Sequence, residues 1–111
     1  MAEQQIRESD WKIWKPLFDV ALNRFCERTL ASAAKYATGQ ESAHERYVKL
    51  YQYLKRKDKE LGDVFDYFSR SRALLQIALA MRKKLITPEE LGTFSQETQE
   101  RVALLLNWPG A

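Results

Sequence analysis

The side chains that most often carry out chemistry are scarce in this chain. It has one histidine, His44, and one cysteine, Cys26, and neither has a partner at the spacing of a metal site or of a nucleophile and its base. Asp63 and Asp66 could share a helix face, but Asp63 follows Gly62 and is better explained as a helix cap. There is no glycine-rich phosphate loop. We therefore expect no catalytic site, no metal and no cofactor, and a protein that is not an enzyme.

Two basic clusters remain as candidate binding elements. Residues 55–59 read Lys-Arg-Lys-Asp-Lys, and residues 82–84 read Arg-Lys-Lys. They leave open an alternative function, a small helical regulator that binds nucleic acid. The formal net charge is only +3, however, and a dedicated nucleic-acid binder concentrates more positive charge on one face. A run such as 55–59 is more often a solvated turn, and the cations at 82–84 suit the negative end of a helix dipole.

Length and composition predict a single folded domain over residues 1–111. Of these residues 45% are hydrophobic and 30% are charged, with only four glycines and three prolines, which argues against a disordered chain. The single cysteine excludes an intramolecular disulfide and favours a reducing compartment. Residues 1–8 lack the apolar segment of a signal peptide. We expect a cytoplasmic protein that does not bind a membrane.

The apolar segment 73–81 is the centre around which the other elements must be arranged. It reads Ala-Leu-Leu-Gln-Ile-Ala-Leu-Ala-Met, so a helix here is apolar on every side and must be covered by neighbours all round. It is shorter than the roughly 20 residues that span a bilayer, and Arg70, Arg72 and residues 82–84 flank it. Gln76 is its one polar residue, and we expect it to bond to a backbone carbonyl or to a partner chain.

The chain before residue 40 predicts one long helix. Apolar residues recur every three or four positions from Trp11 to Tyr36. Ser9 is suited to cap the start of this helix, and Gly39 to end it. Pro16 fits either the first turn or a kink after a short lead-in helix.

The length of this helix predicts an elongated molecule. At 1.5 Å per residue it would be about 40 Å long, and one partner helix in a compact chain of this size cannot cover it. We therefore expect a helical hairpin that forms a stalk and pairs with a second copy of the chain. Trp11 and Trp14 near the open end would then be exposed interface aromatics, and we place Trp14 and Phe18 in the dimer interface.

A second long helix returns along the first. Its apolar stripe is interrupted at Asp58, so either the stripe ends there or Asp58 meets a cation of another chain. Gly62 and Asp63 predict the end of this helix and the cap of a third helix that opens with Val64. The stripe itself consists of Tyr47, Leu50, Tyr51, Leu54 and, after the interruption, Leu61.

The last third of the chain predicts two short helices. Residues 87–90 read Thr-Pro-Glu-Glu, a capping box with Thr87 as N-cap and proline at the first helical position. Gly92 ends that helix, and Ser95 caps a last one through Leu106. The expected fold class is all-α, with four to five helices: an elongated hairpin stalk over about residues 9–61 and a small C-terminal head over about residues 63–106.

The order of four segments carries a family resemblance. Residues 49–54 read Lys-Leu-Tyr-Gln-Tyr-Leu, residues 60–67 read Glu-Leu-Gly-Asp-Val-Phe-Asp-Tyr, and the apolar segment and then residues 85–91, Leu-Ile-Thr-Pro-Glu-Glu-Leu, follow. This order resembles the fluorescence recovery protein family of cyanobacteria over about residues 47–106. The resemblance implies an all-helical homodimer with no pigment and no covalent chemistry. It also implies a partner, the photoactivated orange carotenoid protein, whose return to the resting state the family speeds, which ends photoprotective quenching.

Several family positions are substituted in the second helix. Val48 stands where the family has a tryptophan, and Tyr51 and Gln52 replace a His-Asp pair. Asp58 stands at about the position of an arginine that serves dimer contacts and activity in the family. With Tyr47, these positions define the dimer interface that the resemblance implies. We expect a divergent member that keeps the fold and the dimer.

Two positions in the head are kept. Leu74 matches an apolar position implicated in partner contact, and Arg101 matches a basic one. By resemblance these two residues would bind the partner, which is orange carotenoid protein or another protein. In a dimer with these substituted interface positions, Asp58 would pair with Arg56 or Lys55 of the other chain.

Overall fold

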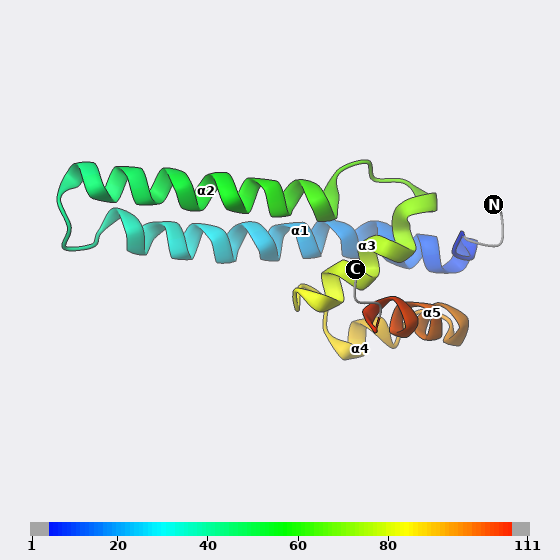
Figure 1. The fold of residues 1–111 in the computed structure, drawn as a ribbon. Coiled ribbons are helices and arrows are strands. Elements are labelled where there is room, and N and C mark those ends of the chain that lie inside the picture. The colour runs from blue at the N-terminus through cyan, green and yellow to red at the C-terminus, as the bar shows by residue number, and fades with distance from the viewer. Residues whose placement is uncertain (1–4, 108–111) are drawn as a thin grey trace.

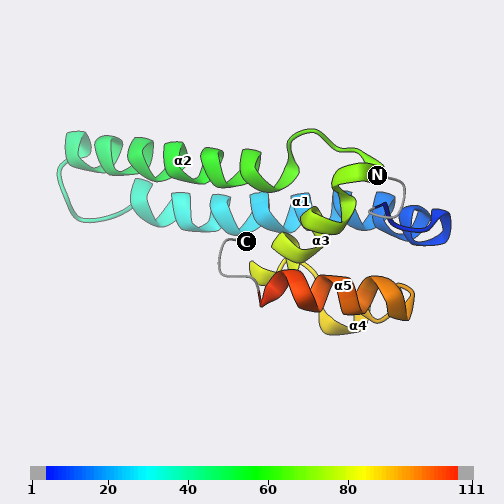
Figure 2. The same cartoon turned by 45° about the vertical axis from the view of Figure 1, so that its right-hand side comes forward.

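The structure is a computed structural model that describes residues 5–107, and every element in that range is helical. Helices α1 and α2 run antiparallel as a stalk, and α3, α4 and α5 form a head beside the first half of α1 (Figures 1 and 2). The chain measures 54 × 24 × 23 Å along its principal axes. The prediction of an all-α fold with five helices and an extended shape is confirmed. The elements are α1 (Glu8–Ala37), α2 (Ala43–Phe65), the 3-10 turn η2 (Arg70–Arg72), α3 (Ala73–Arg82), α4 (Pro88–Leu91) and α5 (Gln96–Leu106).

Helix α1 is continuous over 30 residues. The prediction of Ser9 as its cap is wrong, because the helix already begins at Glu8 and its N-cap, Arg7, makes no side-chain cap bond. Pro16 lies inside the helix and does not end it. It is on the exposed face, where water can replace the missing backbone N–H as a hydrogen-bond partner.

Helix α2 runs past the predicted break. Gly62 and Asp63 lie within it, and it ends at Phe65, so the prediction of a third helix that opens with Val64 is wrong. Val64 and Phe65 are both buried. The burial of two such side chains contributes about 1.5–3 kcal/mol each, which outweighs the cost of about 1 kcal/mol for a glycine inside a helix. The chain reverses afterwards through Tyr67, which has a left-handed backbone with φ 59°.

Helix α3 is the centre of the core, as its composition predicts. Ala73, Ile77 and Ala80 are completely buried, and α3 packs along α5. Gln76 is also completely buried, and its side-chain amide donates to the Asp66 carbonyl at 3.2 Å. This confirms the backbone carbonyl as its partner.

The aromatic residues at the base of the stalk belong to the core of this chain. Trp14 is 0% exposed and Phe18 8% exposed, so the prediction that they face a second copy is wrong. The centroid of the Phe18 ring lies 5.3 Å from that of Phe65 and 4.3 Å from that of Phe68. Trp11 stacks on Phe68 at 4.9 Å. The segment after α2 thus folds back over the first turns of α1 and covers the rings that periodicity alone left uncovered.

A buried carboxylate fixes the start of α5 to the start of α1. Asp10 accepts hydrogen bonds from the Ser95 backbone N–H at 2.8 Å, the Ser95 hydroxyl at 2.7 Å and the Thr98 hydroxyl at 2.8 Å. Burial raises the pKa of Asp10, but these three hydrogen bonds outweigh burial, so the pKa lies below its usual value. Ser95 caps α5 as predicted, so the same residue caps the helix and attaches it to the stalk.

A second polar contact fixes α4 to the middle of α1. The capping box of Thr87 and Glu90 is present, with Pro88 at the first position, as predicted. The Glu90 carboxylate also accepts hydrogen bonds from both terminal guanidinium nitrogens of Arg24, at 2.7 and 3.0 Å. The Arg24 hydrogen bond is the main reason that the pKa of Glu90 falls to about 2. Arg24 in addition donates to the Leu85 carbonyl at 2.9 Å, so one side chain holds the loop and the helix cap together.

Candidate protein-interaction surface

A stripe of exposed apolar residues runs along one side of the stalk. Tyr47 is 70% exposed, Tyr51 59% and Leu30 63%, although all three are large side chains that favour burial. On α2 the stripe follows alternating steps of four and three residues, which keeps successive side chains on one side of a helix. We call this surface the stalk face. It consists of Tyr47, Tyr51, Leu54, Asp58 and Leu61 from α2 and Cys26 and Leu30 from α1.

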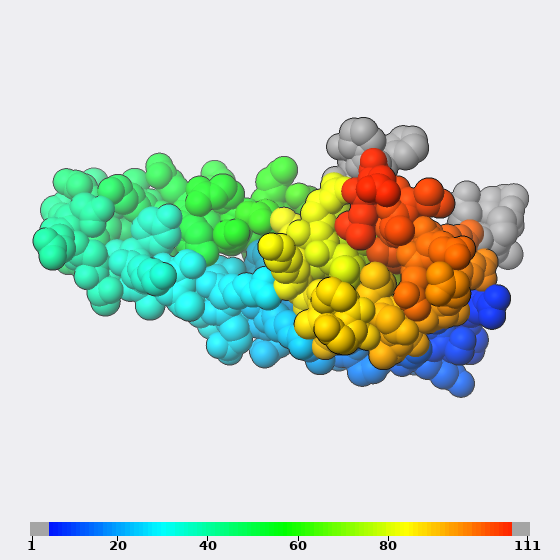
Figure 3. Space-filling view, turned by 90° about the horizontal axis from the view of Figure 1, so that it is seen from below, coloured from blue at the N-terminus to red at the C-terminus, as the bar shows by residue number. Residues whose placement is uncertain are grey.

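The stalk face is uncovered because of how the head is placed. The head lies against the first half of α1, and the far half of the stalk extends beyond it (Figure 3). In a two-helix hairpin, each helix covers the other on one side only. Tyr53 and Tyr36 fill the inner side of the far half, with ring centroids 4.9 Å apart. Within residues 5–107, Leu30, Tyr47 and Tyr51 are therefore left exposed, whereas Leu61 packs partly against the core.

A groove lies along the stalk face between the two helices. It is a cavity of about 420 Å³ whose walls come from α1 and α2. Helix α1 lines it with Phe25, Cys26, Thr29 and Leu30, and α2 lines it with Leu54, Lys57, Asp58 and Leu61. A groove of this kind can receive side chains from an opposing helix, as the holes of a coiled coil do.

Asp58 is the one acidic residue that lines this groove. It is exposed, and it makes no hydrogen bond or ion pair with any other residue in the range that the structure describes. Its neighbour Lys57 lines the same groove but reaches Glu60 at 3.3 Å. A carboxylate inside an apolar stripe is costly to cover unless a cation meets it.

The structure brings together only part of the interface that the sequence predicts. Tyr47, Tyr51 and Asp58 lie on the stalk face, whereas Val48 and Gln52 lie one position further round α2 and flank it. Trp14 and Phe18 lie in the core, as described above. Sequence reasoning missed Cys26 and Leu30. Their signal is a second stripe on α1 at Leu22, Cys26 and Leu30, beside the stripe that faces α2.

The two predicted partner-binding residues lie in the head. Leu74 is in the first turn of α3 and packs partly against the core. Arg101 lies on α5 and is half-buried. Helices α3 and α5 pack along each other. One turn after Arg101, Leu104 is 72% exposed, so α5 has an apolar side chain on its outer surface.

The residues considered for other chemistry are in unremarkable positions. His44 is exposed near the start of α2, and Cys26 lies among apolar side chains of the groove. Within residues 5–107, no three His, Cys, Asp or Glu side chains are grouped so that they could hold a metal ion. In the same range no helix combines the length and apolar character needed to cross a membrane.

The two basic clusters meet at one carboxylate of α2. Lys57 and Lys83, one from each cluster, both contact Glu60, at 3.3 and 2.9 Å. The hydrogen bond from Lys83 is the main reason that the pKa of Glu60 is lowered. Arg82 donates to the Leu106 carbonyl at 2.8 Å, and the Arg56 guanidinium lies 5.5 Å from the centre of the Tyr53 ring. Several of the cations are thus engaged within the chain.

Comparison with known proteins identifies no relative. No protein-family model matches the chain. No curated protein matches it, and no solved structure does. The function is therefore inferred from the surfaces described above and from the resemblance in the order of the sequence segments.

Proposed function

We propose that this protein is a non-enzymatic homodimer that acts as a protein–protein interaction module, similar to fluorescence recovery protein. The stalk face is the observation that supports the dimer. A contiguous apolar surface of large side chains is uncommon on a monomeric protein and marks an interaction site. A second copy laid along the stalk would turn two helices into four and bury Leu30, Tyr47 and Tyr51.

The second copy is the occupant that best fits the charge within this surface. A two-fold dimer places the same surface on both sides, so each groove residue meets residues of the same stripe. Asp58 needs a cation when it is covered, and Arg56 and Lys55 of the other copy are exposed on the adjacent part of α2. Together with Tyr51 and Gln52, these residues would replace the family's His-Asp pair and arginine.

The partner follows from the resemblance. Orange carotenoid protein, in its photoactivated form, is the first partner to test, through Leu74 and Arg101 in the head. A dimer would present two heads, one at each end or side of the paired stalks. As a non-enzymatic module, it would act by binding one conformation of its partner more tightly than another, which shifts the equilibrium and the rate of return.

Nucleic-acid binding is a weaker alternative. It requires the cations of 55–59 and 82–84 to face phosphates along one extended surface, and the formal net charge of the chain is only +3. It predicts affinity that falls steeply with salt, at a slope set by the number of phosphate contacts. The absence of any duplex binding at low salt would remove it.

A matched pair of variants tests the dimer. Leu30 and Ala31 are adjacent exposed residues of α1, but only Leu30 lies on the stalk face. Sedimentation equilibrium should give twice the chain mass of 13.0 kDa for the wild type. Leu30→Glu should give the monomer mass, because a carboxylate would have to be buried, and Ala31→Glu should leave the dimer intact. A monomeric wild type, or the same effect from both variants, would contradict the proposed dimer.

A separate measurement tests the partner. The protein is added to photoactivated orange carotenoid protein, and the return of the resting absorbance is followed in the dark. The wild type should speed this return, and Leu74→Glu should abolish the effect while sedimentation still gives a dimer. A return at the unassisted rate, with a dimer confirmed, would reject this partner and leave the dimer standing.

A further inference from the structure

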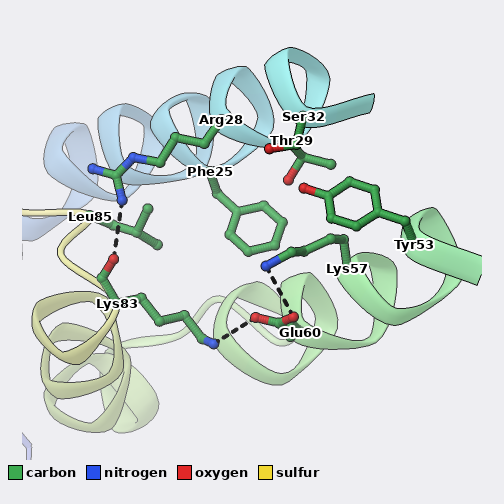
Figure 4. Close-up of a pocket in the computed structure, with 9 residues that line it drawn as sticks. All are labelled: Phe25, Arg28, Thr29, Ser32, Tyr53, Lys57, Glu60, Lys83 and Leu85. Atoms are coloured by element: carbon green, nitrogen blue, oxygen red, sulfur yellow. Dashed lines mark hydrogen bonds and ion pairs between the residues drawn. The ribbon is translucent and has the colours of Figure 1, made fainter. Parts of the chain in front are cut away.

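A second cavity lies at the angle between the stalk and the head (Figure 4). Its volume is about 260 Å³. Helices α1 and α2 supply most of the walls, and the end of α3 closes it through Lys83 and Leu85. It is therefore lined by both parts of the molecule, and it shares Phe25, Thr29 and Lys57 with the groove of the stalk face.

The charges around this cavity do not balance. Three cations line it, Arg28, Lys57 and Lys83, but only one carboxylate, Glu60. Glu60 is shared by the two lysines, at 3.3 Å from Lys57 and 2.9 Å from Lys83. Arg28 is held at the mouth by bonds to the carbonyls of Lys83 and Lys84, at 3.1 and 2.6 Å. The lining thus carries an excess of two positive charges.

Uncommitted hydroxyl groups line the opposite side of the cavity. Thr29, Ser32 and Tyr53 each place a side-chain oxygen toward its interior (Figure 4). Among residues 5–107 none of these three hydroxyls makes a hydrogen bond to another residue of the chain. The Phe25 ring and Leu85 supply an apolar surface, and the Lys57 ammonium lies 6.0 Å from the centre of the Phe25 ring and 5.9 Å from that of Tyr53. The cavity therefore combines free donors, excess positive charge and an apolar surface.

We infer that this cavity binds a small organic phosphate monoester. A phosphate monoester carries close to two negative charges near neutral pH, which matches the excess, and its three terminal oxygens can accept bonds from cations that line the cavity. The apolar wall of Phe25 and Leu85 has room for an organic group of about one ring. A carboxylate would neutralise one charge only, and a larger ligand would exceed the volume.

Such a ligand would regulate the contact between stalk and head. Lys57 belongs to the stalk and Lys83 to the end of α3, so a phosphate bonded to both would link the two parts. A ligand that binds only this arrangement stabilises it in proportion to its occupancy. This inference does not depend on the dimer or on the partner proposed above.

Titration with phenyl phosphate, followed by NMR of the labelled full-length protein, tests the inference. We expect saturable shifts at the cavity residues below about 10 mM ligand. Lys57→Gln should weaken binding about 10-fold, because it removes one charge-assisted contact. Lys59→Gln is the matched control: it makes the same change in charge on the same helix, at an exposed residue outside the cavity, and should bind like the wild type. Tyr53→Phe, which keeps the ring, should weaken binding several-fold.

Three outcomes would overturn the inference. The first is no saturable binding of phenyl phosphate in this concentration range. The second is equal weakening by Lys59→Gln and Lys57→Gln, which would mean attraction by net charge alone. The third is binding of inorganic phosphate as tight as that of phenyl phosphate, which would mean that the apolar wall holds no organic group. Thermal unfolding of each variant, monitored by circular dichroism, confirms that the variants are folded.

Discussion

Replacement of Glu90 by glutamine should weaken the attachment of the head to the stalk while leaving the helix cap in place. In the wild type, the Glu90 carboxylate accepts hydrogen bonds from both terminal guanidinium nitrogens of Arg24, at 2.7 and 3.0 Å. It also accepts the backbone N–H of Thr87 at 2.8 Å. A glutamine side chain keeps an oxygen for Thr87 but loses the charge and one of the two acceptors for Arg24.

The expected magnitude follows from the pKa of Glu90. The pKa falls from 4.5 to about 2, chiefly because of the Arg24 hydrogen bond and despite the opposing effect of burial. At about 1.36 kcal/mol for each pH unit, such a fall is worth on the order of 3 kcal/mol. The side chains of Arg24 and Glu90 are 35% and 28% exposed, so solvent screens the pair, and we expect a loss of about 1–2 kcal/mol in the free energy of unfolding.

The sign of the pH dependence is fixed by the direction of this shift. Because the pKa is lower in the folded state, the carboxylate stabilises the fold fully above pH 4.5, and this contribution is lost as the pH falls toward about 2. The difference in stability between wild type and Glu90→Gln should therefore be largest near neutral pH. It should shrink steadily through this acid range.

Urea unfolding followed by circular dichroism, at one protein concentration and a series of pH values, measures both effects. Glu89→Gln is the control, since Glu89 is the adjacent residue, is exposed and undergoes the same change in charge. It should stay within about 0.5 kcal/mol of the wild type. The reasoning is refuted if the two glutamine variants are equally stable at neutral pH, or if the deficit of Glu90→Gln persists unchanged near pH 2.

Three further predictions concern other contacts of the structure. Asp10→Ala should lower the free energy of unfolding by about 2–4 kcal/mol in urea unfolding, because three donors lose a buried charged acceptor; the exposed Asp19→Ala should change it little. Lys84→Gly should raise stability by about 0.5–1 kcal/mol in thermal unfolding, since Lys84 has φ 59°, a conformation that only glycine adopts without strain; a loss of stability would show that its side chain matters more than its backbone. Asp58→Arg should shift sedimentation from dimer toward monomer, whereas Asp63→Arg, off the stalk face on the same helix, should not; an unchanged sedimentation coefficient for Asp58→Arg would exclude the pairing proposed for this residue.

The elements that the sequence predicts well are those whose cause is local. Thr87 and Glu90 bond to each other's backbone, and Ser95 caps the helix that follows it, so three or four residues contain the whole signal. The break expected at Gly62 is absent because the buried Phe65 packs on Phe18 and Phe25 of α1, which are distant in the sequence. Local propensity is overridden wherever tertiary packing contributes more energy.

The residues of the candidate sites likewise fall into those that local periodicity predicts and those that depend on tertiary packing. Periodicity places Tyr47 and Tyr51 on one side of a helix, and that prediction needs no knowledge of the fold. Periodicity does not tell what covers an apolar side, which is why Trp14 was expected at an interface and lies in the core. The cavity between Lys57 and Lys83 joins residues of separate helices, and no pattern within either segment indicates that they share Glu60.

The position of Cys26 allows thiol labelling to show whether the stalk face is covered. It is the only cysteine in the chain and it lines the groove, so a thiol reagent or a maleimide dye labels one defined place without any engineered mutation. Covering the groove would slow that labelling, and dilution of the protein would restore its rate. The rate at which Cys26 is labelled would thus measure how long the two copies stay together, in the wild-type protein and without an added tag.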